Sequence, residues 1–480
     1  MFMCENHLKL KLNIKYLVLL FLLVQTFVIG ISTYHIESLS PDVDSFLLVG
    51  SEFGRGSLPY EYQYENKPPL LFYIFYIFSV ITSKNPILLK VLKDLIIFSL
   101  ILSSIALGST LDTKNDYKKY SPSLVFLLLI GLNRFQSLFS EYLSLCFLSL
   151  ACIVVLKFKH DYKFFIVGFL LSITTNLNIG SFIFVVGFIL FLILDKRSIL
   201  NIVHFFVGLL SVHFFIFVLY LKANLFDEYI MAMLEIPLIY SNGVFKYRDN
   251  FSELLLSYLN ESSLLYLLFM LILVCFLVLF FKTIYLKLLS SNELLILIMI
   301  NCSILFFYLA KKGYSHHYIY FFYFISFSFL FIKNVKFINI FYFILIIANL
   351  NMINNKLPQS FENILHFESL KNNYPQYSAY LNIKNSIDEV QTVFAEDHML
   401  ILYYLNKRNE SYIAHKGLFD YEEFLNVLIK NNKIYKNEIE QNIKNKPDLL
   451  IIKNKNFDDS LGYKNLYKID RVTSVYIIEK

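Results

Sequence analysis

Runs of about 20 apolar residues recur along the chain as far as Leu350. A helix of about 20 residues crosses about 30 Å of hydrocarbon, so each run is a candidate membrane span. The candidates cover approximately residues 15–33, 88–109, 121–133, 141–157, 163–177, 179–195, 201–221, 262–281, 292–310, 317–333 and 337–350. The sequence therefore predicts a polytopic α-helical membrane protein with about 11–13 membrane helices.

The composition excludes the common soluble classes. Hydrophobic residues make up 57% of the chain and charged residues 17%, whereas soluble domains have about 45–50% and about 25%. The surplus apolar surface is expected to face lipid. The net charge of +6 is small for 480 residues, and the basic residues lie between the apolar runs. The pattern does not favour nucleic-acid binding, which calls for a concentrated basic patch.

The distribution of lysine and arginine predicts the orientation, because short loops rich in these residues stay in the cytoplasm. The basic segments are residues 9–15, 114–119, 157–163, 196–197, 282–287 and 333–336. All of them can be cytoplasmic if the short apolar run 68–82 is only partly inserted or interfacial. The first span then starts in the cytoplasm as a retained anchor, and a loop of about residues 34–67 lies outside. We expect a multi-pass protein of a bacterial inner (plasma) membrane, with its C-terminus extracytoplasmic.

The composition changes after Leu350, where Asn, Lys, Glu and Tyr become abundant. We interpret residues 1–350 as the membrane domain and residues 351–480 as a soluble extracytoplasmic domain. Strand-like runs occur at 392–395, 411–414, 448–452 and 474–478, and helical patterns at 398–406, 421–430 and 435–444. This alternation predicts a small α/β layer.

The first exterior loop carries the chemistry-bearing residues. From Pro41 to Leu71 it reads PDVDSFLLVGSEFGRGSLPYEYQYENKPPLL, with five acids beside Arg55 and Lys67. Charge is costly near a bilayer, so such residues are functional candidates. The alternative is a solvated loop whose charges only keep it in water.

The detailed pattern of this loop resembles the signature of the GT-C glycosyltransferases, and more narrowly the branch of protein O-mannosyltransferases and bacterial lipid A aminoarabinose transferases. The matching positions are Asp44, Gly50, Arg55, Gly56, Leu58, Pro59, Tyr60, Glu65, Lys67, Pro68 and Pro69. Two further exterior elements are similar to family features. They are Glu141 in SEYLSL, and His317 with Tyr318 in GYSHHYIYFF.

The expected reaction is transfer of a sugar from a polyprenyl phosphate donor to an acceptor hydroxyl on a lipid, glycan or protein. Nucleotide sugars are absent outside the cytoplasm, and the resemblance implies the same donor. An inverting transfer needs a carboxylate base, for which Asp44 is the first candidate. The candidates for binding the donor phosphate are Lys67, Arg55, His317 and Lys312. Asp42, Glu65 and Glu141 could hold a divalent ion such as Mg²⁺ or Mn²⁺, or orient sugar hydroxyls.

Several of these residues have simpler interpretations. Arg55 could pair with Glu52 on one helical turn, and Lys312 could anchor the chain at lipid headgroups. His316 and His317 are adjacent, so on a helix only one would face the site. His204 and His213 lie within an apolar run and are expected to bond to neighbouring helices.

Two other classes of protein would also contain this many membrane spans. A secondary transporter or lipid flippase would keep its ionisable residues near the middle of the bilayer and often contains internal repeats, whereas the acids here lie in an exterior loop. A non-catalytic assembly protein would leave the pattern from Asp44 to Pro69 unexplained.

The orientation can be tested with reporter fusions. Alkaline phosphatase, which is active only outside the cytoplasm, should be active when fused after Leu58 and inactive when fused after Lys159. The measurement is the alkaline phosphatase activity of intact cells that carry each of the two fusions. An inactive Leu58 fusion beside an active Lys159 fusion would reverse the orientation and remove the loop from the side where a lipid-linked donor is needed.

Overall fold

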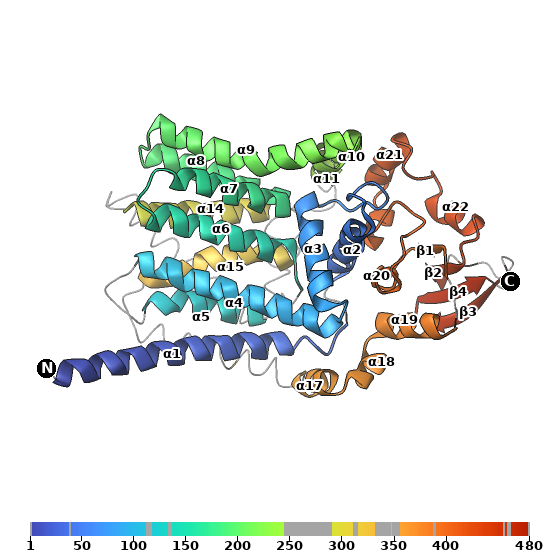
Figure 1. Cartoon of the computed structure of the whole chain (residues 1–480), viewed down its shortest axis with the longest axis horizontal. Helices are drawn as coiled ribbons and strands as arrows, with labels where there is room; N and C mark the ends of the chain where they lie inside the picture. The colour runs from blue at the N-terminus through green and yellow to red at the C-terminus, as the bar shows by residue number, and fades with distance from the viewer. Residues whose placement is uncertain are drawn as a thin grey trace.

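The computed structural model describes residues 2–37, 40–111, 118–132, 137–243, 290–310, 315–331, 347, 356–386, 390–454, 457 and 462–478. Figure 1 shows long helices lying side by side and a smaller mixed domain at one end of them. The N-terminus lies at the far end of the long helices, and the C-terminus lies in the small domain. The expected spans 262–281 and 337–350 lie outside the described residues, apart from residue 347.

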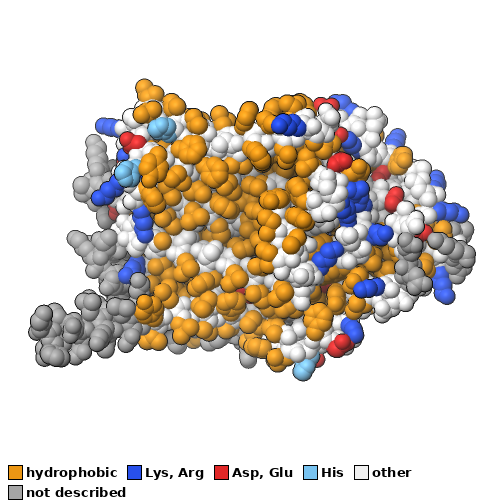
Figure 2. Space-filling model, viewed as in Figure 1, with side chains coloured by type: hydrophobic (Ala, Val, Ile, Leu, Met, Phe, Trp, Pro, Cys, Tyr) orange, Lys and Arg blue, Asp and Glu red, His pale blue; other side chains and the backbone are white. Residues whose placement is uncertain are grey.

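Most of the expected membrane helices are present among the described residues. The bundle consists of α1 (Phe2–Ile31), α4 (Pro86–Leu111), α5 (Ser121–Leu132), α6 (Ser140–Lys157), α7 (Lys163–Leu177), α8 (Phe182–Leu194), α9 (Ile199–Lys222), α14 (Ser291–Ala310) and α15 (Tyr318–Ser326). Of the helices described, α4, α6, α9 and α14 are long and apolar enough to cross a membrane. Figure 2 shows apolar side chains covering the side of this bundle, while charged side chains gather towards its two ends.

Close backbone contact holds two of these helices together. A Cβ atom at Gly168 of α7 would lie 2.0 Å from the carbonyl oxygen of Phe205, and one at Gly208 of α9 would lie 2.1 Å from that of Phe165. Neither position has room for a side chain. In lipid, helices associate through such close van der Waals packing rather than through the hydrophobic effect.

The expected loop between the first two apolar runs is largely helical. It forms α2 (Pro41–Gly50) and the 3-10 helix η1 (Ser51–Arg55), and α3 (Pro69–Thr82) follows. Figure 1 shows α3 standing crosswise at the end of the long helices, beside α2. Such a placement fits the interfacial position expected for residues 68–82, which stays a prediction because the structure contains no membrane.

Short helices join the long helices to one another and to the small domain, and they build much of that domain. They are η2 (Lys118–Tyr120), η3 (Ile179–Ser181), α10 (Phe226–Ile230), the π-helical turn η4 (Met231–Glu235), α11 (Ile236–Gly243), η6 (Ser315–His317), η7 (Phe327–Phe331), α17 (Leu357–Leu365), η8 (Phe367–Ser369), α18 (Leu370–Asn373), α19 (Pro375–Ser386), α20 (Leu400–Leu405), η9 (Lys416–Asp420), α21 (Glu422–Lys430) and α22 (Glu438–Lys444).

The small domain contains a four-stranded sheet. Its strands are β1 (Val393–Ala395), β2 (Leu449–Lys453), β3 (Tyr463–Lys468) and β4 (Thr473–Ile478), in the order β1-β2-β4-β3. Strands β1 and β2 are parallel, and the other pairs are antiparallel. Three of the four expected strands are confirmed, and so is the small α/β layer. The expected strand at 411–414 is wrong as a member of the sheet, because this segment pairs at Ile413 with Tyr64 of the first loop. Strand β3 was not predicted, since its alternation of apolar residues is weak.

One of the hydrophobic clusters extends from the first loop and the adjoining end of the bundle into the small domain. A single cluster joins Phe46 of α2 and Phe72 of α3 to Ile401 of α20 and Val393 of β1. The two parts of the chain are therefore packed as one body around the first loop. The domain boundary near residue 350 stays a prediction, because few residues around it are described.

Candidate functional site

Helix α2 places its two acids on different sides. The side chain of Ser40 accepts a hydrogen bond from the Asp42 backbone N–H, and Pro41 follows it at the first helical position. Both features start helices. Residues two apart on a helix differ in direction by about 200°. As a result, Asp42 and Asp44 reach two different groups of residues.

Asp42 belongs to a group that we call the Lys67 cluster, which consists of Asp42, Glu65, Lys67, His316 and His415. The imidazole Nε2 of His415 lies 2.9 Å from the Asp42 carboxylate oxygen Oδ1. Lys67 acts electrostatically on Asp42, Glu65 and His316. The cluster combines residues of the first loop with one residue from η6 and one from the small domain.

The pKa values of the two carboxyl groups in this cluster are driven apart. Burial by itself would raise the pKa of Asp42, but the hydrogen bond from His415 and the charge of Lys67 hold that pKa well below its usual range. Burial raises the pKa of Glu65, and the nearby charge of Asp42 adds to this shift. Glu65 is 3% exposed, and its Oε2 forms no hydrogen bond to a described residue. Asp42 thus stays ionised while Glu65 tends towards its neutral form.

Glu141 lies next to both histidines of η6. Ligand atoms of Glu141, His316 and His317 all lie within 4.8 Å of one another, a group that we call the Glu141 triad. The expectation that only one of the two histidines faces the site is wrong. They occupy a 3-10 turn ahead of α15 rather than the helix itself, and their ring centroids are 4.5 Å apart.

The surroundings of the triad hold its members in place. The Asn178 side-chain amide donates to Oε1 of Glu141 at 2.8 Å, and Ser140 Oγ donates to Oε2 at 3.2 Å. His316 stacks on Phe139, with 4.4 Å between ring centroids. Burial lowers the pKa of His316 to about 4, which keeps its imidazole neutral. A carboxylate and two neutral imidazoles are a donor set that could hold a divalent metal.

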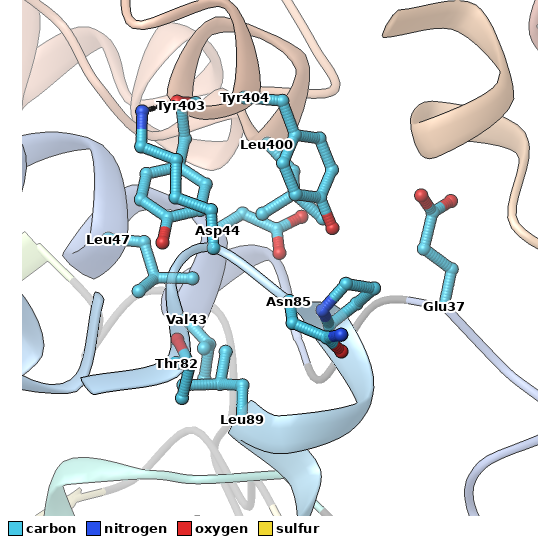
Figure 3. Close-up of a pocket in the computed structure, with 12 residues that line it drawn as sticks. Glu37, Val43, Asp44, Leu47, Thr82, Asn85, Leu89, Leu400, Tyr403 and Tyr404 are labelled. Carbon is cyan, nitrogen blue, oxygen red and sulfur yellow. Dashed lines mark hydrogen bonds between the residues drawn. The ribbon is translucent and has the colours of Figure 1, made fainter. Parts of the chain in front are cut away.

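Asp44 lines a separate small pocket, shown in Figure 3. Its walls include Glu37, Lys84 and Asn85 from the membrane domain, and Tyr403 and Tyr404 from α20. Asp44 is 5% exposed and accepts a 3.4 Å hydrogen bond from the side chain of Gln376. Burial raises the pKa of the neighbouring Glu37 to about 8. The structure therefore does not bring Asp44 into the Lys67 cluster.

The structure places the other candidates for binding phosphate differently. Arg55 pairs with Glu52, as its simpler interpretation expected, and Glu52 also pairs with Arg408 of the small domain at 2.7 Å. The role of Arg55 in binding the donor phosphate stays a prediction. Lys312 and its neighbour Lys311 lie outside the described residues. His213 bonds to Thr175 of α7 at 2.9 Å, which confirms its structural interpretation, whereas Nδ1 of His204 has no hydrogen-bond partner among the described residues.

The small domain supplies residues that the sequence analysis missed. The Tyr64 backbone N–H donates to the Tyr412 carbonyl at 2.6 Å, and the Ala414 N–H donates to the Tyr64 carbonyl at 3.0 Å. This pairing brings the next residue, His415, to Asp42. Gln376 and Arg408 reach the first loop in similar ways. No local pattern marks these three residues, which lie more than 300 positions from their partners in the chain.

No protein-family model matches the chain, and no curated protein sequence matches it significantly. Among solved structures it is similar to ArnT from Cupriavidus metallidurans bound to undecaprenyl phosphate. The TM-score is 0.62 at 9% sequence identity, over 96% of this chain and 97% of that one. It also matches the Archaeoglobus fulgidus oligosaccharyltransferase in complex with Zn and sulfate, with a TM-score of 0.45 at 12% identity, over 91% of this chain and 68% of that one. The likeness to ArnT confirms the expected fold class: the chain has a fold similar to that of ArnT, with a bundle of apolar membrane helices and a small C-terminal α/β domain.

Proposed function

We propose that this protein is a membrane glycosyltransferase that moves a sugar from a polyprenyl phosphate to an acceptor hydroxyl at the Lys67 cluster. The observation that carries the proposal is the gathering of Asp42, Glu65 and Lys67 with three histidines at one end of a bundle with the ArnT fold. ArnT was crystallised with undecaprenyl phosphate, which supports a lipid-phosphate donor.

The residues of the cluster suit both halves of this reaction. The acceptor oxygen forms a bond to the anomeric carbon as its proton passes to a carboxylate. The bond from that carbon to the phosphate oxygen breaks, and its electron pair leaves with the phosphate. Lys67 offers a cation for that phosphate, next to the apolar helix α3 along which a polyprenyl chain could lie.

Two carboxylates compete for the role of base. The resemblance favoured Asp44, which stays a prediction. Geometry supports Asp42, because it shares the cluster with Lys67 whereas Asp44 lines a pocket of its own. The low pKa of Asp42 makes it a weak base in the absence of donor, and a phosphate anion bound at Lys67 would raise that pKa.

The donor site can be tested by binding undecaprenyl phosphate to the purified protein in nanodiscs. Lys67→Ala should weaken binding by about 10- to 100-fold, because it removes a charge-assisted contact of about 1.5–3 kcal/mol. Native mass spectrometry measures the bound lipid. The control is Lys222→Ala, an exposed lysine at the end of α9, which should bind as the wild type does. Equal loss in both variants, or none in Lys67→Ala, would contradict the assignment.

The base can be identified by comparing Asp42→Asn with Asp44→Asn. Loss of the base should slow release of undecaprenyl phosphate from a lipid-linked sugar fraction by about 100- to 10,000-fold and barely affect binding. We expect Asp42→Asn to have this effect, and surface glycans of the cells should change as they do when the gene is deleted. The control is Asp161→Asn, which lies beyond Lys157 at the far end of α6, and Lys157 is about 24 Å along the helix from Glu141. A larger loss in Asp44→Asn would restore the first assignment.

A metal at the Glu141 triad is a second part of the proposal. Glu141, His316 and His317 would hold it, and two imidazoles with one carboxylate suit Zn²⁺ or Mn²⁺ better than Mg²⁺. A bound cation would stabilise negative charge on the departing phosphate.

Metal analysis of the purified protein tests this site directly. The wild type should retain about one equivalent of Zn²⁺ or Mn²⁺ after dialysis, because two imidazoles and a carboxylate match catalytic sites with three protein ligands. His317→Ala should lose most of it. His160→Ala, an exposed histidine between α6 and α7, is the matched control. Equal metal content in all three proteins would exclude the triad as a metal site.

A further inference from the structure

His415 is held in one orientation at the border between the two parts of the chain. Its Nε2 lies 2.9 Å from Asp42 Oδ1, and the backbone N–H of Gly417 donates to its Nδ1 at 3.0 Å. The ring sits at the start of η9, directly after the segment that pairs with Tyr64. Two hydrogen bonds therefore hold the imidazole, and the pairing with Tyr64 positions the backbone just before it.

These hydrogen bonds also define which nitrogen carries the proton. A backbone N–H can only donate, so Nδ1 must accept and is unprotonated. In the neutral ring the proton is then on Nε2, which donates to the Asp42 carboxylate. The bond occupies Oδ1 and leaves Oδ2 of Asp42 for a hydroxyl.

Gly417 leaves just enough room for this arrangement. A Cβ atom at this position would lie 2.9 Å from Cε1 and 3.1 Å from Nδ1 of His415. Any larger residue at 417 would push the ring from its place while leaving His415 itself unchanged. This offers a way to disturb the orientation of His415 without removing its side chain.

We propose that His415 is a positioning residue for glycosyl transfer: the small domain donates it to the site, where it orients Asp42 towards the acceptor hydroxyl. The inference rests on the proposed function. It makes the small domain part of the catalytic machinery rather than an appendage that only recognises the acceptor. Asp42 is the group that meets the substrate, and His415 acts through it.

A purely structural role predicts something different. If the bond between His415 and Asp42 only fastened the small domain, removing it would loosen the domain, and other fastenings of similar strength would matter as much. The chain offers a comparison in Lys433, whose Nζ lies 2.6 Å from Glu228 Oε1 and so joins the small domain to α10 without a residue of the Lys67 cluster.

The experiment compares four full-length variants in nanodiscs. The substrate is the polyprenyl phosphate sugar fraction of the source cells, and released undecaprenyl phosphate is counted by mass spectrometry. His415→Phe should lower kcat by about 10- to 100-fold with little change in KM for the donor, because a misdirected carboxylate still allows the donor to bind. His415→Gln retains an N–H that can reach Asp42 and should recover most of the rate. Gly417→Ala should resemble His415→Phe, and Lys433→Met should resemble the wild type.

Each outcome has a defined meaning. A wild-type kcat in His415→Phe overturns the inference, as does an equal loss in His415→Phe and Lys433→Met. If His415→Phe does not fold, as judged by protease resistance of the small domain, Gly417→Ala decides, because it leaves the His415 side chain present; a wild-type kcat there overturns the inference. If the wild type itself releases no undecaprenyl phosphate, the proposed function fails, which is a separate result from any difference among the variants.

Discussion

Charged side chains at the edge of an apolar helix bundle need partners, and this chain supplies them by folding its small domain onto the first loop. Burying an unpaired charge is expensive, whereas a paired and hydrogen-bonded charge can be tolerated. Glu52 is fully buried and is paired with arginines from both parts of the chain. Glu37 accepts hydrogen bonds from the backbone N–H groups of Gln376 and Tyr377 at the start of α19. Without the small domain, Glu37 and Glu52 would lose hydrogen-bond and ion-pair partners.

The same packing concentrates reactive groups in one place. The Lys67 cluster and the Glu141 triad share His316. Their carboxylates, lysine and imidazoles therefore lie close enough to influence one another electrostatically. Low dielectric surroundings strengthen these interactions and separate the pKa values of neighbouring acids. Such separation is common where one carboxyl group must stay ionised and another neutral.

The sequence predicted the helices of the bundle well, because a membrane span can be recognised locally from the length and apolarity of a single run of residues. It predicted α2 poorly, although Ser40, Pro41 and the acids that follow form a helix start. The loop was interpreted through its charges and its family signature instead. The histidines of η6 show a related error, since the adjacent-residue argument assumed a regular helix where the chain forms a tighter turn.

The sequence by itself determined the membrane character of the chain, the small α/β layer and the acidic first loop that resembles the GT-C signature, because each depends on residues close together in the chain. Only the tertiary structure decided that Asp42 lies in the Lys67 cluster while Asp44 lines a separate pocket, and that His415 reaches Asp42. The first depends on the direction in which α2 turns its side chains. The second depends on a backbone pairing between Tyr64 and Ile413. Local sequence patterns cannot predict a contact between residues so far apart in the chain.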